Sequence, residues 1–189
     1  MRTAIALLFV TLSMVFMLFV KINSDAIMSE YKYIGVSRCQ PCHSVNHKRN
    51  QYDIWEKSAH FGAMTSLNSN KAKKYALDNS ITNPAKNENC VKCHSTGFSK
   101  SYSAFESDFD ISRGVQCEEC HSAGGEYSNY SNMISEKLFL SNGGQKGDIG
   151  HCYDCHSSDV KNKKIDKCPF QDVNFNAKIS FKKIEHPIK

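Results

Sequence analysis

The chain has 189 residues, a length that corresponds to one domain plus any segment removed at the N-terminus. With a hydrophobic content of 40% and a charged content of 23%, nothing in the composition indicates a disordered chain. Of the net charge of +5, one unit belongs to Arg2, Lys21 and Asp25 together, which leaves four on residues 27–189. Nine cysteines are far more than an ordinary cytosolic chain of this length carries.

The N-terminus has the pattern of an export signal. Met1-Arg2 precedes an apolar run over residues 4–20, and Lys21 ends it. Small residues up to Ala26 predict cleavage there, so residues 1–26 are interpreted as a signal peptide and residues 27–189 as the folded domain. The run is at the short limit for a membrane span, so an uncleaved anchor over residues 4–20 is the alternative. Either way, we expect a periplasmic or otherwise exported domain, which is anchored to the inner membrane if residues 4–20 are retained.

Few regular elements are predicted along the rest of the chain. Apolar residues at three- and four-residue spacings predict a helix over residues 50–67, and a Lys/Ala-rich stretch predicts a shorter one over residues 71–77. Alternating residue types predict a small hairpin between Gly97 and Gly114. Around residues 143–144 the two glycines predict a loop.

The pattern Cys-x-x-Cys-His occurs four times, and this is the sequence signature of covalent heme attachment. Two cysteines at this spacing reach the two vinyl groups on one edge of a porphyrin, and the histidine then lies beneath the iron as its proximal ligand. The predicted thioether residues are Cys39, Cys42, Cys90, Cys93, Cys117, Cys120, Cys152 and Cys155, and the predicted proximal ligands are His43, His94, His121 and His156.

Paired cysteines have three other common uses in proteins besides heme attachment. Two zinc ribbons would use four thiolates each but do not require the histidine that follows every second cysteine. A disulfide framework does not explain these histidines either. Thioredoxin-like chemistry needs one such pair on a particular fold. The pattern therefore favours four heme c groups.

Four hemes determine the expected fold class. About 41 residues per heme are too few for a large aliphatic core, so the porphyrins would supply most of the buried apolar surface. We expect a mainly α fold with much irregular structure, in which the chain wraps around four covalently bound hemes. The propionates would bring the oxidised protein close to neutral and the reduced protein to about −4, which argues against a nucleic-acid partner.

The four remaining histidines are candidates for the distal side of an iron. His60 and His186 are predicted distal ligands, because the chain is dense in heme motifs and poor in histidine. His47 follows His43 so closely that a solvated position is favoured, and His151 is a weaker candidate for a neighbouring heme. Cys168 has no partner motif and is interpreted as a buried or idle thiol, with an intermolecular disulfide as the alternative.

Several stretches together resemble a known family. They are Gly35 to His43, Trp55-x-x-Ser58-Ala59-His60-x-x-Ala63-Met64, residues 90–98 and residues 114–121. In this order they are similar to the tetraheme cytochrome c-five-fifty-four family, whose best-known member takes electrons from hydroxylamine oxidoreductase. The resemblance covers residues 33–188.

The resemblance implies specific roles for single residues. His60 would be the distal ligand opposite His156 at the fourth heme, and His186 would lie opposite His121 at the third. The second heme, on His94, would be five-coordinate and open to small ligands. The family often has a histidine soon after the third motif as distal ligand to the first heme, but residues 122–127 contain none. Met133 and His151 are the candidates that remain for this position.

The expected function is electron transfer between redox partner proteins, whose identities are unknown, and an enzymatic activity is not the favoured interpretation. One alternative is a small catalytic cytochrome that acts on a nitrogen oxide or hydroxylamine at an open heme. The other is an electron-conduit subunit of a respiratory complex, which would contact the membrane through a retained N-terminal segment.

Overall fold

The computed structural model describes Ser13, Cys168 and residues 31–44, 50–97, 104–156 and 175–186. The chain divides into two units, Met1–Tyr31 and Lys32–Lys189. Apart from Ser13, the predicted signal or anchor over residues 1–26 lies outside the described residues, and so does His47. In the described part of the chain, no helix has both the length and the apolar character needed to span a membrane.

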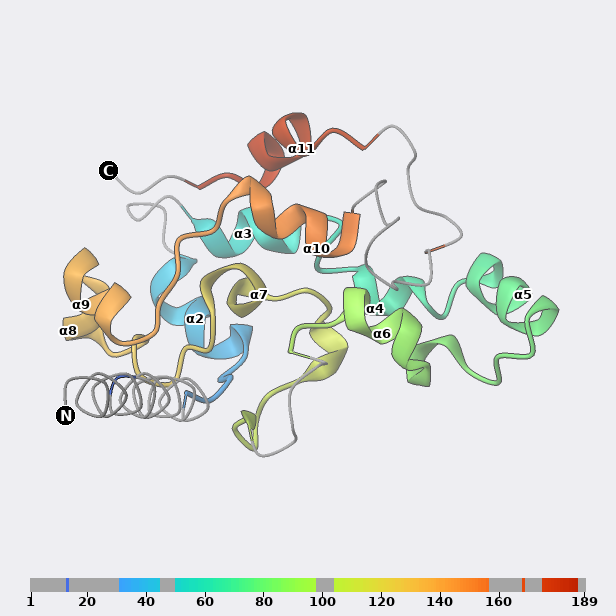
Figure 1. The fold of residues 1–189 in the computed structure, drawn as a ribbon, viewed down its shortest axis with the longest axis horizontal. Coiled ribbons are helices and arrows are strands. Elements are labelled where there is room, and N and C mark those ends of the chain that lie inside the picture. The colour runs from blue at the N-terminus through green and yellow to red at the C-terminus, as the bar shows by residue number, and fades with distance from the viewer. Residues whose placement is uncertain are drawn as a thin grey trace, which may run out of the picture. The chain divides into compact units, whose positions relative to one another are not determined.

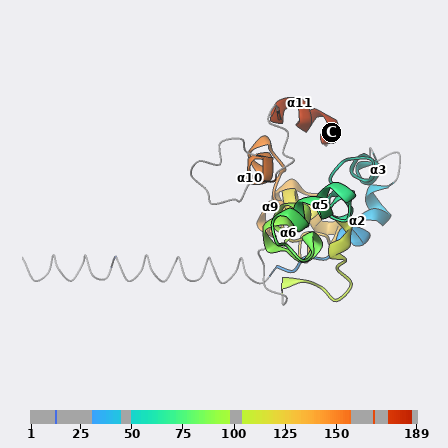
Figure 2. The same cartoon turned by 90° about the vertical axis from the view of Figure 1, so that its right-hand side faces the viewer.

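Short helices joined by irregular segments make up the second unit (Figures 1 and 2). This confirms the expected mainly helical fold with much irregular structure. The α-helices are α2 (Val36–His43), α3 (Gln51–Glu56), α4 (Ala63–Ser66), α5 (Asn70–Asp78), α6 (Glu88–His94), α7 (Cys117–His121), α8 (Tyr130–Met133), α9 (Glu136–Ser141), α10 (Cys152–His156) and α11 (Ala177–Ile184), and the 3-10 helices are η2 (Pro84–Lys86), η4 (Ile111–Arg113) and η5 (Ile149–His151).

The predicted helix over residues 50–67 is in fact two short helices, α3 and α4, separated by a turn. Ser58 is the physical cause: its hydroxyl donates to the carbonyl of Trp55 at 2.7 Å and accepts from the backbone N–H of His60 at 3.2 Å. Such local side-chain bonds replace those of a continuing helix. His60 therefore lies in a turn, where the sequence pattern had predicted a helix.

The helix predicted over residues 71–77 is confirmed as α5. It begins where the hydroxyl of Ser69 accepts from the backbone N–H of Ala72 at 3.2 Å, an N-cap that serine favours. The hairpin predicted between Gly97 and Gly114 is not present in the described part of that segment. Instead, Phe105 forms an isolated parallel bridge with Tyr33, and η4 follows.

Aromatic side chains form the small core beside the third motif. Trp55 contacts Phe61 edge to face, with ring centres 5.2 Å apart, and its indole N–H donates to the carbonyl of Val115 at 2.7 Å. The guanidinium of Arg113 lies 5.7 Å from the centre of the Trp55 ring and donates to the hydroxyl of Tyr52 at 2.7 Å. These contacts join α3 to the segment that leads into the third motif.

A buried carboxylate inside the third motif holds two distant segments together. Glu118 is 1% exposed, and its oxygens accept from the backbone N–H groups of Ile34 at 2.9 Å, Gly35 at 2.8 Å and Gly124 at 2.7 Å. Burial raises the pKa of Glu118, while these three N–H groups oppose that rise. The segment before the first motif is thus anchored directly to the third.

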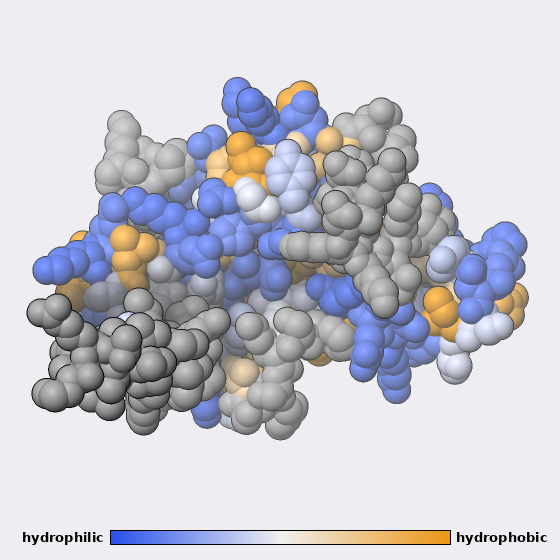
Figure 3. Space-filling model, viewed as in Figure 1, coloured by the Kyte–Doolittle hydropathy of each residue, from blue (hydrophilic) through white to orange (hydrophobic). Residues whose placement is uncertain are grey.

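Large apolar side chains remain exposed in several places, among them Leu77 on α5, Tyr130 on α8 and Ile179 on α11. On the face drawn in Figure 3, apolar residues form separate small areas on a mostly hydrophilic surface. Scattered exposure of this kind is ordinary for folded proteins and defines no docking surface.

Candidate heme-binding site

Each of the four motifs forms the end of a short helix. The last residue of α2 is His43, that of α6 is His94, that of α7 is His121 and that of α10 is His156. Within a helix, residues three apart lie on the same side, so both cysteines of a motif face one direction and the histidine lies next to the second. None of the nine cysteines is in a disulfide. This is the local geometry that heme attachment requires.

The four motifs follow one another in space in an order that differs from the chain. The thiol of Cys39 in the first motif lies close enough to that of Cys117 in the third for the two to interact. Cys120, also in the third motif, is close enough to Cys152 in the fourth for the two to interact electrostatically.

The second motif completes this order, because the thiol of Cys93 lies close enough to that of Cys155 in the fourth for the two to interact. The spatial order is therefore first, third, fourth, second.

Two pairs of histidines face each other across the distance that an iron would occupy. The ring centres of His60 and His156 are 6.2 Å apart, and those of His121 and His186 are 5.8 Å apart. An iron between two imidazoles holds their centres about 6 Å apart, since each iron–nitrogen bond is about 2 Å and each centre lies about 1 Å beyond its nitrogen. The structure thus brings together both pairs that the resemblance implies.

The environment of these rings favours the neutral imidazole that binds a metal. Burial lowers the pKa of His60, and the facing His156 lowers it further. Burial also lowers the pKa of His156 and of His121. A neutral ring keeps a nitrogen lone pair for iron, so the pairs fit heme iron as axial ligands.

Hydrogen bonds to the second ring nitrogen orient several of these ligands. The Nδ1 of His94 lies 2.7 Å from the carbonyl oxygen of Ala63, and that of His121 lies 2.8 Å from the carbonyl oxygen of Gln145. The Nδ1 of His186 lies 2.7 Å from the carbonyl oxygen of Ile184. A carbonyl at Nδ1 fixes the tautomer that leaves Nε2 for the metal, which is the usual arrangement of a ligating histidine.

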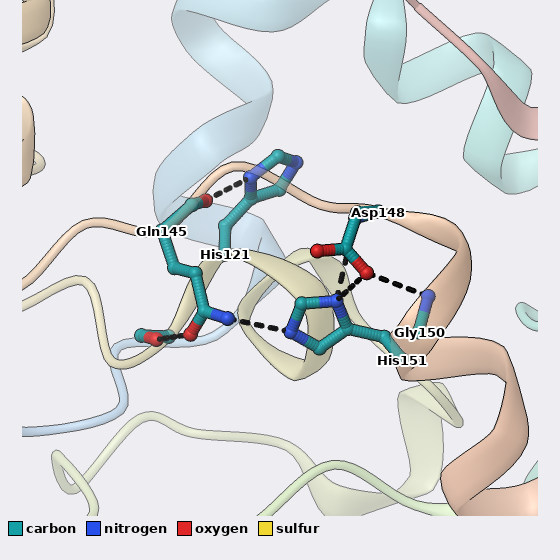
Figure 4. A network of polar contacts seen from close by, with 6 residues as sticks. His121, Gln145, Asp148, Gly150 and His151 are labelled. Carbon is teal, nitrogen blue, oxygen red and sulfur yellow. Dashed lines mark hydrogen bonds and ion pairs between the residues drawn. The ribbon is translucent and has the colours of Figure 1, made fainter.

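The two candidates for the sixth position of the first heme lie in different surroundings. Met133 is the last residue of α8 and is half-buried. His151 has both ring nitrogens engaged: Nε2 lies 2.8 Å from the side-chain nitrogen of Gln145, and Nδ1 lies 3.3 Å from the backbone N–H of Asp148 (Figure 4). These contacts compete with iron for the nitrogens of His151.

The proximal histidine of the first motif has a different partner: the Nδ1 of His43 lies 3.3 Å from the side-chain oxygen of Gln51.

Next to the second motif the structure places a thiol. Cys168 is exposed, and its thiol lies close enough to the imidazole of His94 to raise the pKa of that ring. The predicted burial of Cys168 is therefore wrong, and its neighbour is the proximal histidine of the second motif. Sequence reasoning also missed Glu118 and Gln145, because neither a carboxylate between two motif cysteines nor a loop glutamine has a distinctive pattern.

In the described residues, no three or more His, Cys, Asp or Glu side chains gather into a cluster that could hold a metal ion. The contacts that do converge are the pairwise ones above, between thiols of different motifs and between facing imidazoles. Each motif helix ends in histidine, and two histidine pairs have the spacing of an axially bound iron. This arrangement fits a c-type cytochrome.

Residues 38–122 match the family described as cytochrome c554 and c-prime. The match supports the predicted family over this region, which is a little under half of the chain, contains the first three motifs and ends before the fourth. The matched region is thus similar to c-type cytochromes, a class of proteins that hold heme c and carry electrons. The searches found no matching curated protein and no matching solved structure.

Proposed function

We propose that this protein is an exported tetraheme cytochrome that carries electrons between two redox partner proteins. The observation that carries the proposal is that cysteines of successive motifs interact with one another, from the first motif through the third and fourth to the second. Hemes attached at these positions would be neighbours in that order. A series of adjacent redox centres suits the passage of electrons better than chemistry at one isolated centre.

The bound hemes would supply one-electron couples, and the chain would hold each iron in a fixed environment. His60 with His156, and His121 with His186, would fill both axial positions of two irons. A closed iron changes its ligands little when its charge changes, which favours outer-sphere transfer. The motifs at the ends of the series, the first and the second, are then the places where electrons enter and leave.

The number of hemes is the first test. We expect the mature protein to exceed its polypeptide mass by four heme groups and to show the absorption spectrum of ferrous c-type heme. Replacing Cys152 and Cys155 together with alanine should remove one heme. Cys168→Ala is the matched control, because Cys168 belongs to no motif, and it should keep all four. A colourless protein, or one that holds zinc in place of iron, would refute the proposal.

A second candidate function, chemistry on a small nitrogen species at the second heme, is favoured by one observation. His94 has the thiol of Cys168 as a neighbour, whereas His121 and His156 each face an imidazole. We expect carbon monoxide to bind the ferrous second heme if its sixth position is open, with a shift of the Soret band. If neither carbon monoxide nor nitric oxide binds in either redox state, the catalytic alternative is excluded.

Export is tested separately from heme content. Mass spectrometry of the mature N-terminus should locate cleavage after Ala26. Retention of residues 1–21 with the protein in the membrane fraction would instead support the anchored conduit subunit.

A further inference from the structure

The loop between α9 and η5 lies directly against the third motif. The backbone N–H of Gln145 donates to the carbonyl of His121 at 3.0 Å, and the carbonyl of Gln145 lies 2.8 Å from Nδ1 of the same histidine. Gly147, two residues further along the chain, packs closely against the same motif: a side-chain Cβ at this position would lie only 3.3 Å from Cβ of Cys120. The main chain of Gln145 thus contacts His121 at both its backbone and its ring.

The side chain of Gln145 is itself held at both ends of its amide. Its oxygen accepts from the hydroxyl of Ser122 at 3.0 Å, and its nitrogen lies 2.8 Å from Nε2 of His151. Asp148 lies at the other nitrogen of the His151 ring: its carboxylate oxygen is 3.4 Å and its backbone nitrogen 3.3 Å from Nδ1. Figure 4 shows these residues as one connected series that ends at His121.

The order of this series gives His151 a role other than that of an iron ligand. To reach an iron at the first motif, His151 would have to give up its contacts with Gln145 and with Asp148. Its side chain is only 19% exposed, whereas that of Asp148 is 70% exposed, so the ring is the inner member of the pair. A half-buried ring with both nitrogens engaged is suited to fixing the amide that it contacts.

We propose that Gln145 and His151 are positioning residues for His121, and that together they set the orientation and basicity of the axial ligand of the third heme. A carbonyl fixed at Nδ1 increases the electron donation of the ring and so stabilises the ferric iron. If the loop is loosened, the carbonyl no longer holds a single position and the third heme becomes easier to reduce. This inference rests on the proposed attachment of a heme at the third motif.

The test uses the full holoprotein and reads individual hemes by low-temperature electron paramagnetic resonance and by spectroscopic redox titration. The low-spin signal that disappears in His186→Ala identifies the third heme, because His186 faces His121. In His151→Ala and in Gln145→Ala we expect that signal to change its g-values. At a fixed potential its ratio of reduced to oxidised iron should rise several-fold, within the roughly tenfold range of such outer-shell changes.

Two further variants make the outcome decisive. His151→Gln keeps a group that can contact Gln145 and should restore most of the wild-type signal. Lys146→Ala is the control in the same loop, because Lys146 pairs with Glu136 at 2.7 Å on an exposed surface, and it should leave the third heme unchanged.

The possible results separate this inference from the proposed function. If His151→Ala turns a different low-spin heme high-spin, His151 is a ligand of the first heme and the positioning role is wrong. If four hemes are present and the third is unaffected in both alanine variants, the positioning role is equally wrong. Fewer than four hemes in the wild-type protein would contradict the proposed function itself.

Discussion

Replacing Glu118 with alanine should destabilise the fold more than any other single change at a carboxylate in the described region. The change leaves the N–H groups of Ile34, Gly35 and Gly124 without their acceptor. Each buried N–H group left unpaired costs about 1–3 kcal/mol. Removing a poorly solvated carboxylate offsets part of the total cost of the three groups. We therefore expect the free energy of unfolding to fall by about 3 kcal/mol. That is a large part of the ~5–15 kcal/mol that stabilises a typical domain.

Glu118→Gln should show a different dependence on pH. The pKa of Glu118 is raised from its usual 4.5, mainly by burial, so the folded state binds this proton more tightly than the unfolded state does. The stabilisation from this proton is complete below the unfolded pKa and is lost as pH rises through the folded pKa. The stability advantage of the wild-type protein over Glu118→Gln should therefore shrink from acid towards neutral pH.

Both expectations are measured by urea denaturation followed by far-ultraviolet circular dichroism, at several pH values. Glu126→Gln is the control, since Glu126 is exposed and lies in the loop after the same motif. A loss below about 1 kcal/mol in Glu118→Ala would mean that the three N–H groups find other acceptors, and the anchoring role would be refuted. A stability difference that does not vary with pH would refute the role of burial.

Three further changes have defined outcomes. His60→Ala removes the imidazole that faces the fourth motif, so one additional heme should become high-spin and bind carbon monoxide; an unchanged resonance spectrum would contradict this pairing. Arg113→Ala removes the cation over Trp55 and a hydrogen bond, and should lower stability by about 1–2 kcal/mol in the same urea assay. Cys168→Ala should change the affinity of the second heme for carbon monoxide, because the thiol beside its proximal ligand His94 is gone, and an equal affinity would show that the thiol does not influence this heme.

The heme attachment residues could be predicted from sequence because their chemistry is local. A covalent bond at each cysteine and a ligand directly after it fix the spacing within one pentapeptide. His60 and His186 could be predicted as candidates because few histidines were left over. Their partners, His156 and His121, came from the resemblance to a family and not from any local pattern.

The parts that sequence reasoning missed depend on contacts between distant segments or on competition by a single side chain. The helix over residues 50–67 had the right apolar spacing, but the hydroxyl of Ser58 takes backbone bonds that a longer helix needs. His151 was a plausible ligand by residue type alone. Only the fold shows that Gln145 and Asp148 occupy its two nitrogens.

The anchoring of Gly35 by Glu118 has a consequence for how the chain is assembled. These residues are 83 positions apart, and the whole second motif lies between them. A chain emerging from its N-terminus cannot close this contact until the third motif has appeared, so the first motif must stay without its final neighbour until then. The second motif must wait longer, until the fourth has appeared. Heme loading of the early motifs can thus take place on a segment that has not yet folded.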